Sequence, residues 1–252
     1  MPMLHSTPGP EAHFALEALA YLVGARVYWR IAARGVMPSW PDRLLLLGCT
    51  VLGALAGSKL LHVAEHFDYL LAQSQPQLWL SGKSVLGGFL GGTLGAEIGK
   101  KVLRWSRPTG DPWVPALVVG LLIGRLGCQL SGTWDQTYGI PTDLPWDWDY
   151  GDGIGRHPTA LYEMILVVAA FAVTRITRIR ARAGASFAAF IGLYCLLRFF
   201  LEFLKPPFGI GAADVLPTGT YSGLTAIQWT ALLGMVWFST MLRIRLRRQE
   251  NY

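Results

Sequence analysis

Two arginines and one histidine stand out because each lies within or beside a strongly apolar stretch of the sequence. Arg125 lies in the run GLLIGRLG, Arg198 lies in LLRFFLEF, and His157 directly precedes a third apolar run. Ionisable side chains are costly inside a membrane, and they often mark functional sites there. A guanidinium group matches phosphate geometrically, and a low dielectric strengthens the attraction. Because the phosphate at that depth belongs to a phospholipid headgroup, these residues predict a lipid-phosphate site.

Carboxylates in the same stretches allow a second interpretation. Glu202 follows Arg198 by four residues, a spacing that places both side chains on one helix face. Glu163 lies in the apolar run after His157, and Glu17 lies in the first apolar stretch of the chain. Arg198 with Glu202, and Arg125 with Glu163, could be purely structural ion pairs. The spacing leaves both interpretations open.

The elements that must position these side chains are membrane-type helices. The chain has 252 residues, of which 52% are hydrophobic and 15% charged. This balance is typical of lipid-embedded proteins and excludes disordered and collagen-like chains. Since about 20 apolar residues span the hydrocarbon core as a helix, the sequence predicts an all-α polytopic membrane protein that forms a single domain over residues 1–252. The seven expected transmembrane helices cover about 14–33, 43–63, 84–103, 112–130, 158–176, 187–204 and 224–242.

Lysine and arginine alternate between the connections and thereby predict an orientation. Basic clusters follow the first, third, fifth and seventh helices, whereas the opposite connections hold only Arg156 and Lys205. The N-terminus is therefore expected outside and the C-terminus in the cytoplasm. The net charge of +6 is explained by these topology signals, not by nucleic-acid binding. Residues 131–157, rich in aspartate and aromatic residues, are predicted to form an ordered extracytoplasmic loop.

Glycines recur at every fourth position of the third predicted helix. The positions are Gly87, Gly91, Gly95 and Gly99, with Gly88 alongside. One interpretation is close packing against another helix. The other is that a lipid headgroup lies against exposed backbone N–H groups near Ser84, Gly87 and Gly88. The two interpretations are compatible.

The three cysteines, Cys49, Cys128 and Cys195, form no CxxC pair, so the spacing predicts neither a disulfide framework nor a zinc site. No nucleotide-binding loop is visible, and we expect no metal and no cofactor. Cys128 is expected to pack as a small apolar side chain, with a role as a covalent nucleophile as the alternative.

The middle of the chain resembles the bacterial prolipoprotein diacylglyceryl transferase family. The resemblance covers about residues 82–206. It rests on GKSVLGG (82–88), DPWVP with GLLIGRLG (111–127), YGIPTDLPW (138–146), RHPTALYE (156–163) and LLRFFLEF (196–203). It implies transfer of a diacylglyceryl group from phosphatidylglycerol to the cysteine thiol of a preprolipoprotein, with release of glycerol phosphate.

The resemblance also implies roles for individual residues. Arg125 and Arg198 match the family's two essential arginines, which hold the phosphate. Gly139 matches a glycine of the outer loop. The positions that match the surroundings of the headgroup chamber are His157, Tyr162, Glu163 and Glu202.

The chain departs from the family pattern at three positions. A histidine of the family falls on Leu86, an asparagine falls on Cys128, and a tyrosine of the first helix falls on Glu17. A thiol acceptor needs a base to become the attacking thiolate, and leucine cannot act as one. Glu17 and His157 are the candidates for that base.

These observations predict a multi-pass transferase of the bacterial cytoplasmic (inner) membrane. Its expected partners are phosphatidylglycerol or another anionic phospholipid, and a prolipoprotein cysteine or a related acceptor. The alternative, favoured by Leu86 and Cys128, is a non-catalytic phospholipid-binding or membrane-assembly paralogue.

Overall fold

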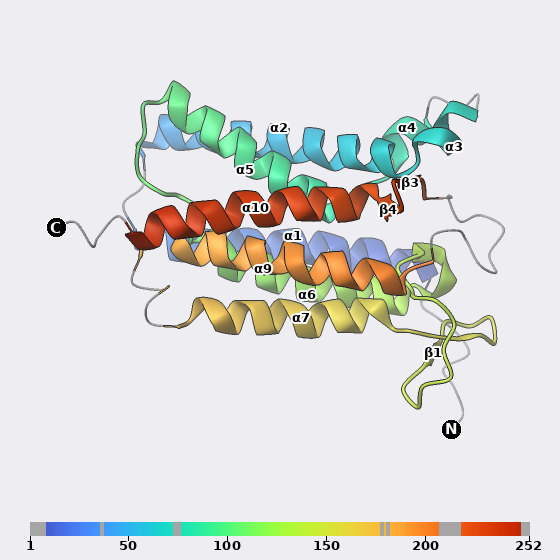
Figure 1. The fold of residues 1–252 in the computed structure, drawn as a ribbon. Coiled ribbons are helices and arrows are strands. Elements are labelled where there is room, and N and C mark those ends of the chain that lie inside the picture. The colour runs from blue at the N-terminus through green and yellow to red at the C-terminus, as the bar shows by residue number, and fades with distance from the viewer. Residues whose placement is uncertain are drawn as a thin grey trace.

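The protein is mostly helical in the computed structural model, which describes residues 9–35, 38–72, 77–176, 179, 182–206 and 218–247. Helices of at least 16 residues overlap all seven predicted ranges. They are α1 (Gly9–Ala32), α2 (Trp40–Glu65), α5 (Val85–Val102), α6 (Trp113–Leu130), α7 (Thr159–Thr174), α9 (Ala185–Leu201) and α10 (Ala226–Arg247) (Figure 1). The prediction of a helical fold is thus confirmed.

Three of these helical stretches are long and apolar enough to cross a membrane by length and composition. They are α2, α6 and Ala185–Leu204, which joins α9 to the 3-10 turn η2 (Glu202–Leu204). Helix α7 is apolar but shorter, with 16 residues. The total of seven spans and the orientation of the termini stay predictions.

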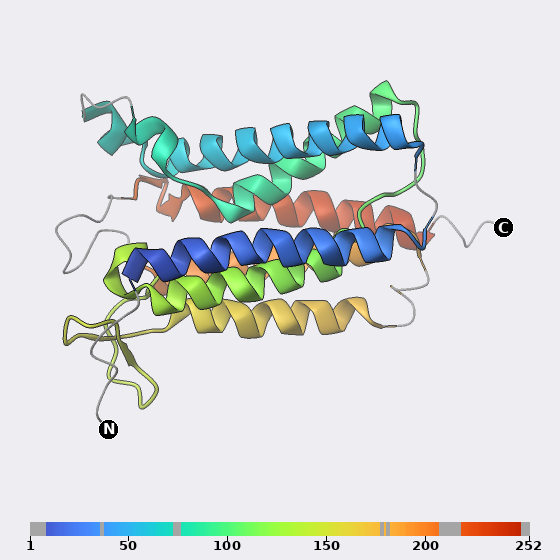
Figure 2. The same ribbon diagram turned by 180° about the vertical axis from the view of Figure 1, so that it is seen from behind.

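The long helices lie side by side as a bundle (Figures 1 and 2). Helices α2 and α5 form an outer layer, α10 lies next to it, and α7 lies on the opposite side of the bundle. The short elements gather at the end where α1 begins, and the C-terminal end of α10 lies at the other end. These short elements are α3 (Phe67–Ala72), α4 (Leu78–Ser81), η1 (Gly132–Asp135), β1 (Trp148–Asp149), β2 (Gly155–Arg156), β3 (Thr220–Tyr221) and β4 (Leu224–Thr225).

Glycines bring the backbones of α2 and α5 into direct contact. A Cβ atom on Gly57 would lie 2.3 Å from the carbonyl oxygen of Gly87, and one on Gly91 would lie 2.2 Å from that of Gly53. No side chain fits at such distances, so each of these positions requires glycine. The packing interpretation of the glycine stripe is confirmed, and it follows the pattern of small residues at membrane helix interfaces.

Helix α9 carries Arg198 and lies in the centre of the core. Its first turn is capped by Asp111, whose carboxylate accepts hydrogen bonds from the N–H groups of Gly184 at 2.6 Å and Phe187 at 2.9 Å. Phe190 is fully buried, and α9 contributes more residues to the main apolar cluster than any other helix described. Arg198 is therefore presented from a rigid element.

The segment 131–157 is anchored by an internal ion pair. Arg156 is 1% exposed and donates to both carboxylate oxygens of Asp152 at 2.7 Å. Its guanidinium group lies 4.8 Å from the centre of the Tyr138 ring. The hydrogen bonds from Arg156 hold the pKa of Asp152 below its usual range. Tyr150 ties the segment to α6 by donating to Gln129 at 3.1 Å.

Candidate functional site

Arg125 and Glu163 form an ion pair between α6 and α7 in the interior of the bundle. The Nη2 atom of Arg125 lies 2.8 Å from Oε1 of Glu163, and the two residues are 9% and 3% exposed. Tyr194 of α9 donates its hydroxyl hydrogen to the same carboxylate oxygen at 2.7 Å. One carboxylate therefore connects three helices.

Arg198 lies beside this carboxylate, one helical turn after Tyr194. Glu163, Tyr194 and Arg198 line the same narrow pocket. Arg198 pairs with Glu202 through its Nη1 atom, and both residues are buried. The two arginines, 73 positions apart in the sequence, thus meet around Glu163. Both ion pairs named by the structural interpretation are present.

The guanidinium group of Arg125 retains hydrogen-bonding capacity. Its Nε atom is buried and has no hydrogen-bond partner among the described residues, and its Nη1 atom faces only the sulfur of Cys128, at 3.6 Å. Leaving a buried donor unsatisfied costs about 1–3 kcal/mol. An anion that accepted from this N–H group would recover that energy.

An apolar groove begins next to the narrow pocket lined by Glu163, Tyr194 and Arg198. It lies between α7 and α9, has a volume of about 350 Å³, and shares Leu166, Leu197 and Leu201 with the pocket. Its outer wall includes Ile165 and Phe200, which are 66% and 60% exposed. The buried ion pairs and the exposed apolar groove lie side by side, an arrangement that suits a molecule with an anionic head and hydrocarbon chains. The pocket lined by Glu163 and Arg198 has no space of its own, so an anion would enter only by displacing a carboxylate from its arginine.

Lys205 is a third cation at this site, and sequence reasoning did not select it. Its ammonium group interacts electrostatically with both arginines and with their two glutamate partners. Burial and the neighbouring Arg198 lower the pKa of Lys205 to about 8. Its position directly after the run LEFL was the available signal. Tyr194 was also missed, because a tyrosine inside an apolar helix reads as a core residue.

The side chains of His157, Tyr162 and Trp146 are linked by hydrogen bonds. Its Nδ1 atom lies 3.2 Å from the hydroxyl oxygen of Tyr162, which accepts a hydrogen bond from the indole N–H of Trp146 at 2.7 Å. With Nδ1 donating to that hydroxyl, Nε2 is left as a proton acceptor. The half-buried imidazole therefore has a fixed ring position.

Gly139 lies where the segment 131–157 contacts η2. Its N–H group donates to the His157 carbonyl at 2.9 Å, and the next residue, Ile140, donates to the carbonyl of Leu204 at 2.8 Å. A Cβ atom on Gly139 would lie 2.6 Å from Cβ of His157 and 2.8 Å from the Leu204 oxygen. Glycine is thus required where the backbone passes between His157 and the end of η2.

The remaining predicted residues lie on α1 and α5. Glu17 forms an ion pair with Lys83 and accepts a hydrogen bond from Tyr21 at 3.1 Å. The backbone N–H of Ser84 donates to Ser58 of α2 at 2.9 Å.

The contacts of the α5 glycines also run to α2, where Gly87 meets Gly57, and Gly88 lies opposite Ala54. Leu86 is 1% exposed and belongs to the main apolar core.

The sequence matches a known family over most of its length. A family model described as prolipoprotein diacylglyceryl transferase matches residues 14–244. The chain belongs to this family. Its relatives are named as transferases, so the chain belongs to a family of membrane transferases.

Individual relatives carry the name phosphatidylglycerol–prolipoprotein diacylglyceryl transferase. The protein of Geobacter sulfurreducens is 31% identical over 196 residues, which cover 75% of this chain and 73% of the relative. The protein of Nitrosospira multiformis is 35% identical over 76% of this chain and 65% of the relative. That of Bordetella parapertussis is 29% identical over 85% of this chain and 84% of the relative.

Proposed function

We propose that the protein transfers a diacylglyceryl group from phosphatidylglycerol, or a similar anionic glycerolipid, to a thiol acceptor such as a prolipoprotein cysteine. In this proposal it is a single seven-span domain of the bacterial cytoplasmic membrane, with its N-terminus outside. The observation that carries the proposal is the meeting of Arg125 and Arg198 around Glu163, directly beside an apolar groove.

The arginines would act on the charge that develops in the reaction. A thiolate sulfur attacks the glyceryl carbon attached to the phosphate oxygen, a carbon–sulfur bond forms, and the carbon–oxygen bond breaks. The phosphodiester, with one negative charge, leaves as glycerol phosphate, with a second charge developing on the departing oxygen. Preorganised guanidinium groups in a low dielectric stabilise that additional charge in the transition state. Arg125 and Arg198 are the proposed clamp, and Lys205 adds positive charge below pH 8.

His157 is the proposed base for the acceptor thiol. Tyr162 fixes its ring through Nδ1, and Gly139 and Tyr162 serve as positioning residues. Glu17 is the second candidate, but its carboxylate is neutralised by Lys83. In the same proposal Glu163 and Glu202 hold the arginines until the phosphate enters, and Ser84, Gly87 and Gly88 shape the neighbouring helix contact.

Transfer is tested with the purified protein in phosphatidylglycerol nanodiscs and a peptide with a lipoprotein signal cysteine. Lipid labelled in its headgroup glycerol reports release of glycerol phosphate, and mass spectrometry reports the thioether on the peptide. The wild type should produce both products in equal amounts, and Arg198→Gln should produce neither. Arg243→Gln is the matched control, because Arg243 is exposed at the end of α10.

A non-catalytic lipid-binding protein is the second candidate. Two observations favour it: both arginines are already paired with carboxylates, and Leu86 is packed in the core. In this case the wild type would retain phosphatidylglycerol but release no glycerol phosphate with any thiol acceptor. Retention that is lost in Arg198→Gln, without turnover in the wild type, would support this candidate and refute the transferase proposal.

A further inference from the structure

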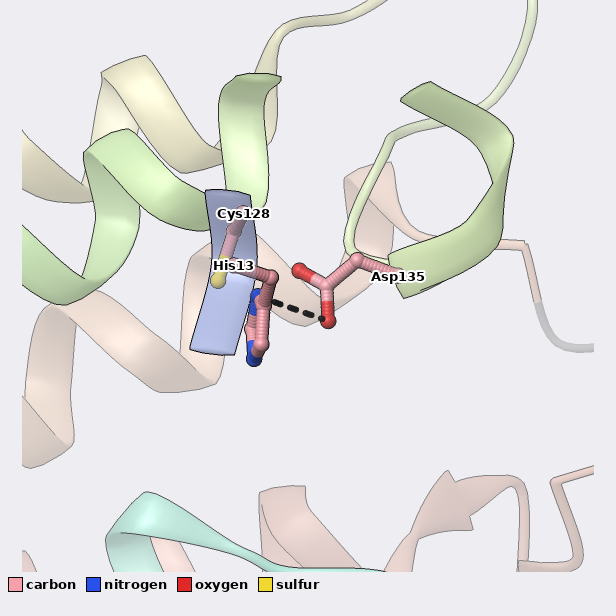
Figure 3. Close-up of side chains that lie close together, drawn as sticks. All are labelled: His13, Cys128 and Asp135. Carbon is pink, nitrogen blue, oxygen red and sulfur yellow. Dashed lines mark ion pairs between the residues drawn. The ribbon is translucent and has the colours of Figure 1, made fainter. Parts of the chain in front are cut away.

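Three side chains that could bind a metal ion converge at the end of the bundle where α1 begins (Figure 3). His13 comes from α1, Cys128 from the end of α6, and Asp135 from η1. One ligand atom of each lies within 4.8 Å of the others. The close-up shows the imidazole beside the Asp135 carboxylate, with the sulfur of Cys128 on the side of the ring away from it. The three residues come from separate segments, so no sequence spacing predicts the group.

The separation of His13 and Asp135 matches that of two ligands of one cation, whereas the full group, spread over up to 4.8 Å, would have to draw closer around an ion. The Nδ1 atom of His13 lies 3.7 Å from Oδ1 of Asp135, beyond ordinary hydrogen-bond length. Two ligands of one tetrahedral zinc ion lie about 3.3–3.8 Å apart, given bonds of about 2.0–2.3 Å. Moreover, Nδ1 is buried and makes no hydrogen bond within the described part of the chain. A cation between the two groups would satisfy both.

Two of the three side chains have a hydrogen-bonded outer partner that would orient them as ligands. Thr137 donates to Oδ2 of Asp135 at 2.7 Å, and Arg125 donates toward the sulfur of Cys128. Hydrogen bonds from outer partners are usual around protein metal ligands. Glu17 lies 3.9 Å from Nε2 of His13, beyond hydrogen-bond length.

The ligand set selects the kind of ion. One thiolate, one imidazole and one carboxylate suit zinc, whereas magnesium and calcium require several oxygen ligands. The thiolate and the carboxylate together balance the charge of a divalent ion. The rings of Phe14 and Trp134, 5.4 Å apart, flank His13 and provide an apolar wall.

We propose that His13, Cys128 and Asp135 form a binding site for Zn²⁺, with the fourth position open to water or to a substrate atom. Three protein ligands with one open position are typical of catalytic zinc sites. Binding requires the Cys128 thiol to lose its proton to solvent, so the affinity rises with pH. The site lies one helical turn from Arg125, but the inference is independent of the proposed transferase activity.

The test uses the purified full-length protein without lipid substrate. After incubation with Zn²⁺ and removal of the excess, the wild type should retain an equimolar amount of zinc by elemental analysis. Replacement by Co²⁺ should give a thiolate-to-cobalt charge-transfer band and visible bands of a four-coordinate ion. Cys128→Ser should lose the charge-transfer band. His13→Ala should lose the tight binding of the metal.

Cys49→Ser is the matched control, since Cys49 of α2 packs against Gly99 of α5. It should leave both signals unchanged. A charge-transfer band that persists in Cys128→Ser would overturn the proposal, as would the absence of retained metal in the wild type. Should the ligand variants fold poorly, alkylation of Cys128 in the wild type decides the question. Zn²⁺ should slow the modification of Cys128, and an unchanged rate would refute the site.

Discussion

Replacing Arg125 with glutamine should strongly destabilise the protein, because the buried Glu163 would lose its ion-pair partner. Glu163 is 3% exposed, and its nearest cation is Arg125 at 2.8 Å. Removing one partner of a buried ion pair typically costs about 3–5 kcal/mol. At about 2–4 °C per kcal/mol for a protein of this size, the midpoint of thermal unfolding should fall by about 6–20 °C.

The double variant Arg125→Gln/Glu163→Gln separates the structural role from the functional one. It removes both charges while keeping two side chains that can hydrogen-bond to each other and to Tyr194. Its unfolding midpoint, followed by intrinsic fluorescence in detergent, should recover most of the loss. Transfer activity should stay absent, because the proposed phosphate clamp is gone. If the double variant regains activity together with stability, Arg125 is structural only and the proposed clamp is wrong.

The remaining predictions concern single positions. Gly139→Ala should lower the transfer rate about 100-fold by displacing His157. Gly48→Ala is the control, because an added Cβ there meets nothing within 4 Å, and it should leave the rate unchanged. Equal rates in the two variants would contradict the positioning role of Gly139. Gly91→Ala should lower the free energy of unfolding by about 1–3 kcal/mol through overpacking against α2, and an unchanged unfolding midpoint would disprove that contact. Affinity for phosphatidylglycerol should fall as the pH rises through 8, because Lys205 becomes neutral and the site loses one positive charge. Lys205→Arg should abolish that pH dependence in a lipid-binding titration, and its persistence would assign the effect to another group. Leu86→His should raise transfer to the peptide, and an unchanged rate would refute the match of this position to the family histidine.

Periodicity and charge were sufficient to predict the helices, because long apolar runs in a membrane allow little besides a helix. The close packing of α5 against another helix could also be predicted, since glycines four residues apart leave one helix face without side chains. Both ion pairs followed from residue type and spacing as one of two interpretations. Whether the arginines are only structural or also bind a phosphate depends on their surroundings. The unsatisfied Nε atom of Arg125 and the groove beside Leu201 are seen only in the structure.

Other parts of the site could not be read from the chain. Lys205 follows η2 directly and interacts electrostatically with both arginines, whereas a lysine at a helix end ordinarily signals an interface with water. His13, Cys128 and Asp135 meet because α1 packs beside α6 and η1, a contact that no local pattern encodes. Gly139 was selected by resemblance, whereas its physical reason is a close backbone approach.

The central claim is that one lipid phosphate binds between Arg125 and Arg198. It is tested most directly by an experimental structure of the protein in phosphatidylglycerol nanodiscs. We predict phosphate density within about 3 Å of both guanidinium groups, with an acyl chain in the groove between α7 and α9. Lipid bound elsewhere, with both arginines still closed on Glu163 and Glu202, would contradict it.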